Sequence, residues 1–196
     1  MDVQRFLETL SSLYENWNLP SVKPKSEKFT SILQQVEGMT TANIMQLLNW
    51  AVECLHPGEV YCEVGCWRGA TLIGALLEHP DCLAYAIDDF SEFDQSGGTL
   101  DIFQQNLSNF NLDEQVFFAQ EDFTKFFQEL QTIGLEEKIG VYFYDAAYNY
   151  RSIFLALLLV KPFLADQAIL VFTNTNFDDT QQAIFDFTST HSQSQV

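Results

Sequence analysis

Residues 59–74 combine an apolar strand that ends in an acidic residue, a turn with two glycines and an apolar helix in one short stretch. This strand–turn–helix order builds α/β proteins, in which helices pack on a sheet. Gly65 and Gly69 stand at the turn, where a residue without a side chain lets a ligand approach the backbone. The helix that follows begins with free N–H groups that can bind a polar or anionic group. The stretch therefore predicts an α/β protein with a ligand site directly after this strand.

The glycine spacing narrows the kind of ligand site. Gly65 and Gly69 are separated by three residues and follow Glu63-Val. The dinucleotide-binding dehydrogenases use the different spacing Gly-x-Gly-x-x-Gly to approach a pyrophosphate. The chain also lacks an evident Tyr-x-x-x-Lys or catalytic histidine. A nicotinamide dehydrogenase is therefore the disfavoured interpretation.

Strand and helix patterns alternate along the rest of the chain. Helical spacing of apolar residues predicts three N-terminal helices, at 2–17, at 26–36 and between about 41 and 55. Short apolar runs then predict five strands, each followed by a helix, at 59–64, 83–88, 115–119, 139–144 and 168–172. Alternating units of this kind predict a mostly parallel sheet with helices on both faces, which is a Rossmann-like three-layer αβα sandwich.

The length of 196 residues suits one domain. We expect a single domain over 1–190, with an N-terminal helical cap at 1–56, a Rossmann-like core at 57–190 and a polar tail at 191–196. The N-terminal helices are expected either to form a lid over the carboxyl edge of the sheet or to pack on one of its faces.

Charge and hydropathy exclude several partners. The net charge is −18, from 27 acidic and 9 basic residues, and such a field repels nucleic acids and anionic membranes. No apolar run is long enough for a membrane span, and no signal peptide is evident at the start. The four cysteines do not have zinc-site spacing. We therefore expect a cytoplasmic enzyme with reduced thiols that acts on a small molecule.

A polar residue stands at or directly after the carboxyl end of each predicted strand of the sheet, where ligands of open parallel sheets bind. These residues are Glu63, Asp88 with Asp89, Asp122, Asp145, and Thr173 with Asn174. Asp88 lies 23 residues after Gly65, close to the interval expected for an acid that binds ribose hydroxyls. Asp122 can accept from an adenine amino group or cap the next helix, and Glu63 can accept from an ammonium group. The pattern predicts an adenosine-type ligand.

Several motifs together resemble a known family. They are Glu37-Gly-Met-Thr, Tyr61-Cys-Glu-Val-Gly-Cys-Trp-Arg-Gly, Ala86-Ile-Asp-Asp-Phe-Ser-Glu-Phe, Tyr144-Asp-Ala-Ala-Tyr-Asn-Tyr and Leu159-Val-Lys-Pro-Phe-Leu. Over roughly residues 35–186 the chain resembles the class I S-adenosylmethionine (SAM)-dependent methyltransferases. The branch is methyltransferase family 24-like, related to macrolide and sugar O-methyltransferases.

The resemblance implies a role for each matching residue. The turn from Gly65 to Gly69, with Cys66 and Trp67, would hold the methionine part of SAM. Asp88, with Asp89, would hold the ribose, and Asp122 the adenine. Asp145 would lie near the transferred methyl group or a metal ion.

The chain departs from the family pattern at three places. Tyr148 stands where a histidine is common, and Thr173 and Asn174 stand where two aspartates commonly hold a divalent ion. We therefore expect no metal, with Asp145 and Tyr148 as the catalytic residues. The third departure is a C-terminal β-hairpin that is missing or truncated, which leaves the strand at 168–172 as an edge. A homodimer could cover that edge.

Two functions stay open. The first is SAM-dependent O- or N-methylation of a small-molecule acceptor. The second is a catalytically impaired protein that binds SAM or S-adenosylhomocysteine (SAH), which the two departures at the catalytic positions favour. In either case we expect a valine at Gly65 to fill the place of the ligand while the fold survives.

Overall fold

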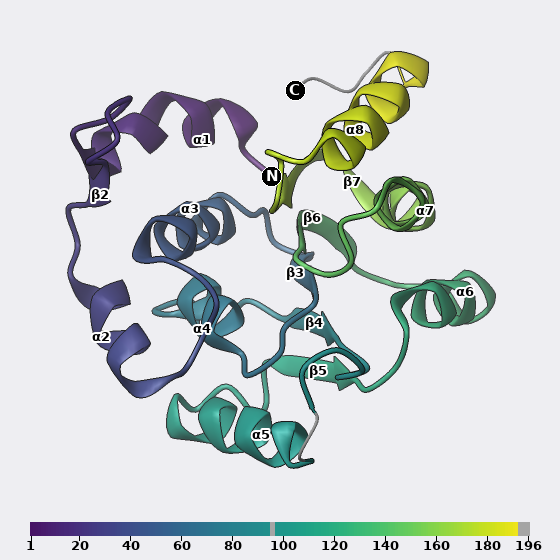
Figure 1. Cartoon of the computed structure of the whole chain (residues 1–196), viewed down its shortest axis with the longest axis horizontal. Coiled ribbons are helices and arrows are strands. Elements are labelled where there is room, and N and C mark those ends of the chain that lie inside the picture. The colour runs from purple at the N-terminus through teal and green to yellow at the C-terminus, as the bar shows by residue number, and fades with distance from the viewer. Residues whose placement is uncertain (95–96, 192–196) are drawn as a thin grey trace.

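The computed structural model describes residues 1–94 and 97–191, so all of the predicted polar tail except His191 lies outside the described residues. Five strands form one parallel sheet in the order β5-β4-β3-β6-β7 (Figure 1). Their bounds are β3 (Glu59–Val64), β4 (Ala84–Ile87), β5 (Val116–Ala119), β6 (Lys138–Tyr144) and β7 (Leu164–Phe172). The predicted parallel sheet is confirmed, and β3, which leads into the glycine turn, lies at its centre.

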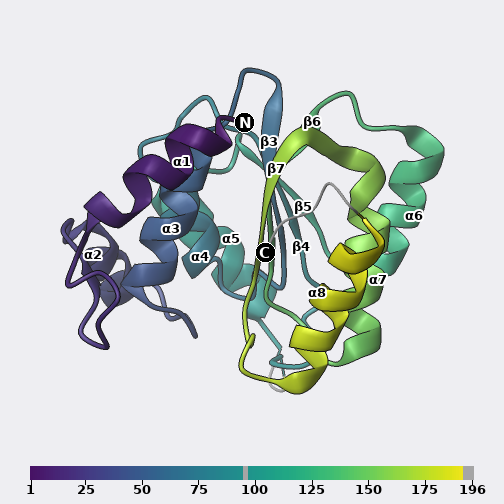
Figure 2. The same cartoon turned by 90° about the horizontal axis from the view of Figure 1, so that it is seen from above.

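Helices cover both faces of the sheet (Figure 2). One face carries α4 (Ala70–Leu76) and α5 (Thr99–Asn109), and the other carries α6 (Phe123–Ile133), α7 (Tyr150–Val160) and α8 (Asp178–Thr190). Alternate residues of β6 enter opposite cores, since Val141 and Phe143 pack with the first set of helices and Tyr142 and Tyr144 with the second. The nearly continuous apolar run in β6 therefore reflects burial on both faces.

The N-terminal helices belong to the first of these two layers. They are α1 (Val3–Leu10), α2 (Lys28–Gln35) and α3 (Ala42–Glu53), and α3 packs directly on α4. The buried amide of Asn49 on α3 donates to the carbonyl oxygens of Gly74, Ala75 and Leu77, at the end of α4. These helices thus pack beside the sheet, as the second of the two expected arrangements, and only Ile44 at the start of α3 reaches the cavity from the described part of these helices.

The predicted helix at 2–17 is too long. It ends at Leu10, followed by a 3₁₀ turn (Ser11–Leu13) and by β1 (Tyr14–Glu15), which pairs antiparallel with β2 (Lys23–Pro24). The Ser12 hydroxyl donates to the carbonyl oxygen of Thr9, a local bond that competes with the helix. Asn16 and Asn18 then adopt positive φ and reverse the chain.

The strand β7 is at one edge of the sheet. Within 1–94 and 97–191 it pairs with β6 alone, and every one of its side chains is at least partly exposed. The expected cover by a second subunit stays a prediction. None of the helices in the described part of the chain is long and apolar enough to cross a membrane.

Candidate active site

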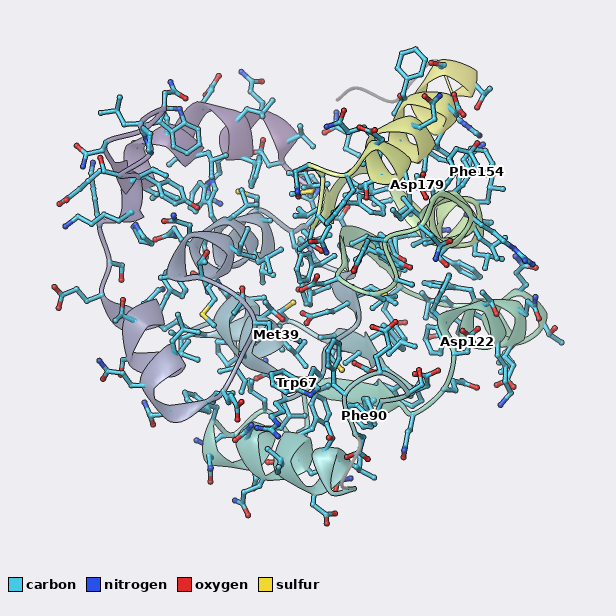
Figure 3. The ribbon with its side chains drawn as sticks, viewed as in Figure 1. Met39, Trp67, Phe90, Asp122, Phe154 and Asp179 are labelled. Carbon is cyan, nitrogen blue, oxygen red and sulfur yellow. The ribbon has the colours of Figure 1, made fainter. Side chains whose placement is uncertain are left out.

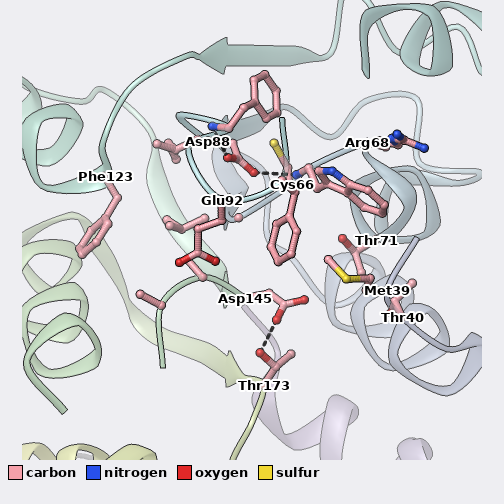
Figure 4. A pocket seen from close by; sticks show the side chains of 18 of the residues that line it. Met39, Thr40, Cys66, Arg68, Thr71, Asp88, Glu92, Phe123, Asp145 and Thr173 are labelled. Atoms are coloured by element: carbon pink, nitrogen blue, oxygen red, sulfur yellow. Dashed lines mark hydrogen bonds between the residues drawn. The ribbon is translucent and has the colours of Figure 1, made fainter. Parts of the chain in front are cut away.

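A cavity of about 500 Å³ lies over the carboxyl ends of the strands (Figure 4). All five strands contribute the residues that follow them, and the loop before α3 adds Gly38–Thr41. Met39, Trp67 and Asp122 reach it from three of these segments (Figure 3). Eight of the ten predicted site residues line this cavity, namely Gly65, Cys66, Trp67, Asp88, Asp89, Asp122, Asp145 and Tyr148, whereas Glu63 and Gly69 do not. Residues from 38 to 174 therefore converge on one site, as the topology of a parallel sheet requires.

The turn after β3 is tightly packed against the end of β6. Gly65, Trp67 and Gly69 all have positive φ, which glycine adopts without steric cost. A Cβ added at Gly65 would collide with the carbonyl oxygen of Asp145 and lie 2.6 Å from its carbonyl carbon. The expectation that a side chain at Gly65 would fill the ligand's place is therefore wrong, because it would strike the backbone after β6 first.

Asp88 joins two loops of the site. Its Oδ2 accepts from the backbone N–H of Trp67 at 2.7 Å, and its Oδ1 accepts from that of Phe90 at 2.8 Å. Burial raises the pKa of Asp88, and the two N–H donors oppose this rise. Each oxygen keeps a lone pair for a further donor such as a ribose hydroxyl. Asp89 lines the same cavity and accepts from the backbone N–H of Ser91 at 2.9 Å.

Asp122 caps α6 and also lines the cavity. The two alternatives given for it, a helix cap and a residue at the ligand site, are therefore compatible. Its Oδ1 accepts from the backbone N–H of Thr124 at 2.9 Å and from the Thr124 hydroxyl. Its Oδ2 makes no hydrogen bond within the described residues. Phe123 and Phe90 both line the cavity, and the Phe90 ring also stacks on Phe118 in the core at 5.5 Å.

Glu63 does not line the cavity. It is fully buried beneath the turn, where the Tyr61 hydroxyl donates to its Oε2 at 2.6 Å and the Thr71 hydroxyl donates to its Oε1. Burial raises the pKa of Glu63 to about 8. Thr71 lies between Glu63 and the cavity, so an ammonium group there would meet Thr71 and not the carboxyl group itself.

The buried Glu63 predicts that folding stability depends on pH. The unfolded chain loses this proton above about pH 4.5, whereas the folded chain keeps it up to about pH 8. The folded state therefore binds more protons between these values, and the free energy of unfolding falls as pH rises, by at most about 1.4 kcal/mol per pH unit from this group. The free energy of unfolding, measured in urea at several pH values, should fall less steeply with pH in Glu63→Gln than in the parent protein. The exposed control Glu136→Gln should show the same pH dependence as the parent. Equal slopes in all three proteins would contradict a protonated Glu63.

Asp145 and Tyr148 lie in the loop after β6 but in different surroundings. The Thr173 hydroxyl donates to Oδ1 of Asp145 (Figure 4), and burial raises the pKa of this carboxyl group. Oδ2 of Asp145 has no hydrogen-bond partner in the described residues. Tyr148 is half exposed at the mouth of the cavity, where its ring stacks on Phe177 at 4.9 Å.

Some residues of the cavity were not predicted as site residues. Glu92 and Glu121 reach it from the loops after β4 and β5, and Met39 and Thr40 reach it from the loop before α3. Only the motif Glu37-Gly-Met-Thr pointed to the latter pair, as part of the family resemblance. Within residues 1–94 and 97–191, no group of three or more His, Cys, Asp or Glu side chains is placed to hold a metal ion.

A parallel sheet of this strand order, with one cavity across all its carboxyl ends, defines a Rossmann-like α/β protein that binds its ligand at the sheet edge. Residues 62–175 match the model of a family described as a methyltransferase domain, and the chain belongs to this family, methyltransferase family 24. The resemblance found in the sequence motifs is confirmed. The comparison with curated proteins gives no match.

Solved structures of methyltransferases share the fold. An O-methyltransferase from Bacillus cereus, in complex with SAH, is 15% identical with a TM-score of 0.63, over 87% of this chain and 81% of that one. The O-methyltransferase TomG from Streptomyces achromogenes, involved in tomaymycin synthesis and in complex with SAM, is 15% identical with a TM-score of 0.62, over 100% and 88%. CalS11, a TDP-rhamnose 3'-O-methyltransferase, is 16% identical with a TM-score of 0.61, over 95% and 82%.

Proposed function

We propose that the protein transfers a methyl group from SAM to an oxygen or nitrogen atom of a small molecule, without a metal ion. The observation that carries this proposal is the single cavity that brings Trp67, Asp88, Asp122 and Asp145 together from four strand ends. Membership of a methyltransferase family supports the reaction. Two of the similar structures contain SAM or SAH, which supports the cofactor. The cytoplasmic location stays a prediction.

The donors and acceptors around the cavity fit SAM. The carboxylates favour a positively charged ligand, and SAM supplies an electrophilic methyl group on a cationic sulfur. Asp88 would accept from the ribose hydroxyls and Asp122 from the adenine amino group. The indole N–H of Trp67 is buried without a hydrogen-bond partner among the described residues, which leaves an unsatisfied donor in a side chain that lines the cavity.

Asp145 is the proposed general base. Its Oδ1 is oriented by the Thr173 hydroxyl, which leaves Oδ2 to accept the proton of the acceptor. Its raised pKa brings the carboxylate closer to the pKa values at which a general base works well. Tyr148, at the mouth, would orient the acceptor. Thr173 and Asn174 stand beside Asp145 in place of further carboxylates, which makes this a poor site for Mg²⁺.

These same departures favour a second candidate, a protein that binds SAM or SAH without turnover. The histidine and the paired aspartates that are common in the family are missing, and Tyr148, Thr173 and Asn174 stand in their places. Binding of SAH together with no methyl transfer to any acceptor of a broad panel would support this candidate over the enzyme.

The cofactor site can be tested by an exchange that keeps the helix cap. Asp122→Asn retains an oxygen for the backbone N–H of Thr124, and Asn caps helices as well as Asp does. It loses the second carboxylate oxygen, so the dissociation constant for SAH, measured by calorimetric titration, should rise about tenfold or more, as expected for a lost hydrogen bond to a charged group.

A matched control exists at the other end of the molecule. Asp2 caps α1 in the same way, accepting from the backbone N–H of Arg5 at 2.9 Å. Asp2→Asn should leave SAH affinity unchanged. Parent protein that binds NAD but neither SAM nor SAH would refute the proposed function, and unchanged SAH affinity in Asp122→Asn would refute the adenine site.

A further inference from the structure

The side chains around the cavity carry an unbalanced charge. Six acids line it, namely Asp88, Asp89, Glu92, Glu121, Asp122 and Asp145. Arg68 is the single basic side chain in this lining of described residues. A positively charged cofactor would offset one of these negative charges, so the space left for the acceptor stays negative.

Arg68 is itself already paired. Its guanidinium forms a salt bridge with Glu37 and lies over the Trp67 ring, 4.6 Å from the ring centroid. It is therefore held at the side of the cavity by an acid and an aromatic face. A carboxylate or phosphate on the acceptor would therefore meet, in the described lining, six acids and a single basic group whose charge is already paired with an acid.

The mouth of the same cavity is apolar. Met39, Phe93 and Tyr148 line it and are 62%, 53% and 51% exposed, and Phe177, which is 43% exposed, stacks on Tyr148 at an interplanar angle of 14°. They come from four separate segments: the loop before α3, the loop after β4, the loop after β6 and the residue before α8. Exposed large apolar side chains gathered around one opening indicate a binding surface.

The shape of this surface suits a flat ligand. Phe93 meets Trp67 edge to face at 6.1 Å between ring centroids, and the rings of Tyr148 and Phe177 are nearly parallel. Aromatic faces and a methionine side chain bind planar apolar molecules well. Tyr148 is also in the same short loop as Asp145, so a molecule held on these rings lies beside the proposed base.

We propose that the methyl acceptor is an aromatic molecule that carries no negative charge, and that the site rejects acceptors with a carboxylate or phosphate. The inference rests on the proposed function and specifies its substrate class. The acidic lining excludes anions and admits neutral or cationic substituents. The aromatic mouth supplies the affinity for the ring.

Three phenols of one shape provide the test: tyramine is cationic, tyrosol is neutral and 4-hydroxyphenylacetate is anionic. Calorimetry on protein saturated with SAH should show tyramine and tyrosol binding at least about tenfold more tightly than 4-hydroxyphenylacetate. Glu92→Lys should narrow this ratio, because it places a base in the lining. Glu136→Lys makes the same charge change near the opposite edge of the sheet and should keep the ratio of the parent.

The outcomes separate the two proposals. Failure to bind SAH refutes the proposed function and the acceptor class with it. Binding of SAH together with equal or tighter binding of the anion overturns the charge selectivity alone. Binding of none of the three phenols to SAH-saturated protein overturns the aromatic site. Phe177→Ala should weaken the binding of tyrosol and leave SAH affinity unchanged. Phe185, which is exposed on α8, provides the control, and Phe185→Ala should change neither affinity.

Discussion

Replacement of Asp145 by asparagine is expected to lower kcat by at least about 100-fold, the usual contribution of a general base. The amide is nearly isosteric with the carboxyl group and can still accept the hydrogen bond of the Thr173 hydroxyl, so the loop should keep its conformation. It cannot take the proton of an acceptor hydroxyl. Steady-state rates with an acceptor found by screening phenols and amines measure the loss, and calorimetry should show SAH affinity unchanged within about threefold.

The pH profile distinguishes a base from a residue that only shapes the site. Asp145 must be ionised to act, and burial raises its pKa, so the rate of the parent protein should rise with pH through that pKa. The Thr173 hydroxyl lowers the pKa of Asp145 by donating to the carboxylate. Thr173→Val should therefore shift the rising limb to higher pH. A kcat that is unaffected by Asp145→Asn would leave catalysis to the alignment of the reactants alone.

The strands of the sheet could be predicted from the sequence, because burial on both faces of the sheet gives each strand a short run of apolar residues. The strand at 59–64 was predicted with the bounds it has, and the acids Asp88, Asp122 and Asp145 meet because parallel strands end at one edge. The hairpin of β1 and β2 was missed, since apolar residues up to Tyr14 keep helical spacing and the turn depends on two asparagines with positive φ.

The position of Glu63 shows where motif spacing is insufficient. Side chains alternate along a strand, so Glu63 shares a face with Tyr61, and both point into the core beneath α4. A count of residues from the glycines places an acid next to the turn but does not say on which side of it. Glu92 and Met39 stand in motifs of the family resemblance but were not predicted as site residues, because their loops have no periodic pattern that fixes the path of the chain.

A single methyl group at Gly65 is expected to have the largest effect on the fold. Gly65→Ala places a Cβ against the carbonyl group of Asp145 and 3.1 Å from the backbone nitrogen of Ala146, while φ is +89°. The left-handed conformation costs about 1–2 kcal/mol for a residue with a side chain, and overpacking costs typically about 1–3 kcal/mol more. We expect the free energy of unfolding, measured in urea, to fall by about 2–5 kcal/mol. SAH binding should fall with it, since the loop after β6 must move.

The variant Gly58→Ala separates the conformational cost of a side chain at positive φ from the cost of overpacking. Gly58 has nearly the same φ of +84°, but nothing lies within 4 Å of the position of its Cβ. This variant should lose only the conformational part, about 1–2 kcal/mol, and should bind SAH as the parent does. The difference between the two variants measures the close approach of the glycine turn to the end of β6. Equal destabilisation by both would mean that the backbone after β6 yields freely, and the contact would then not hold Asp145 at the cavity.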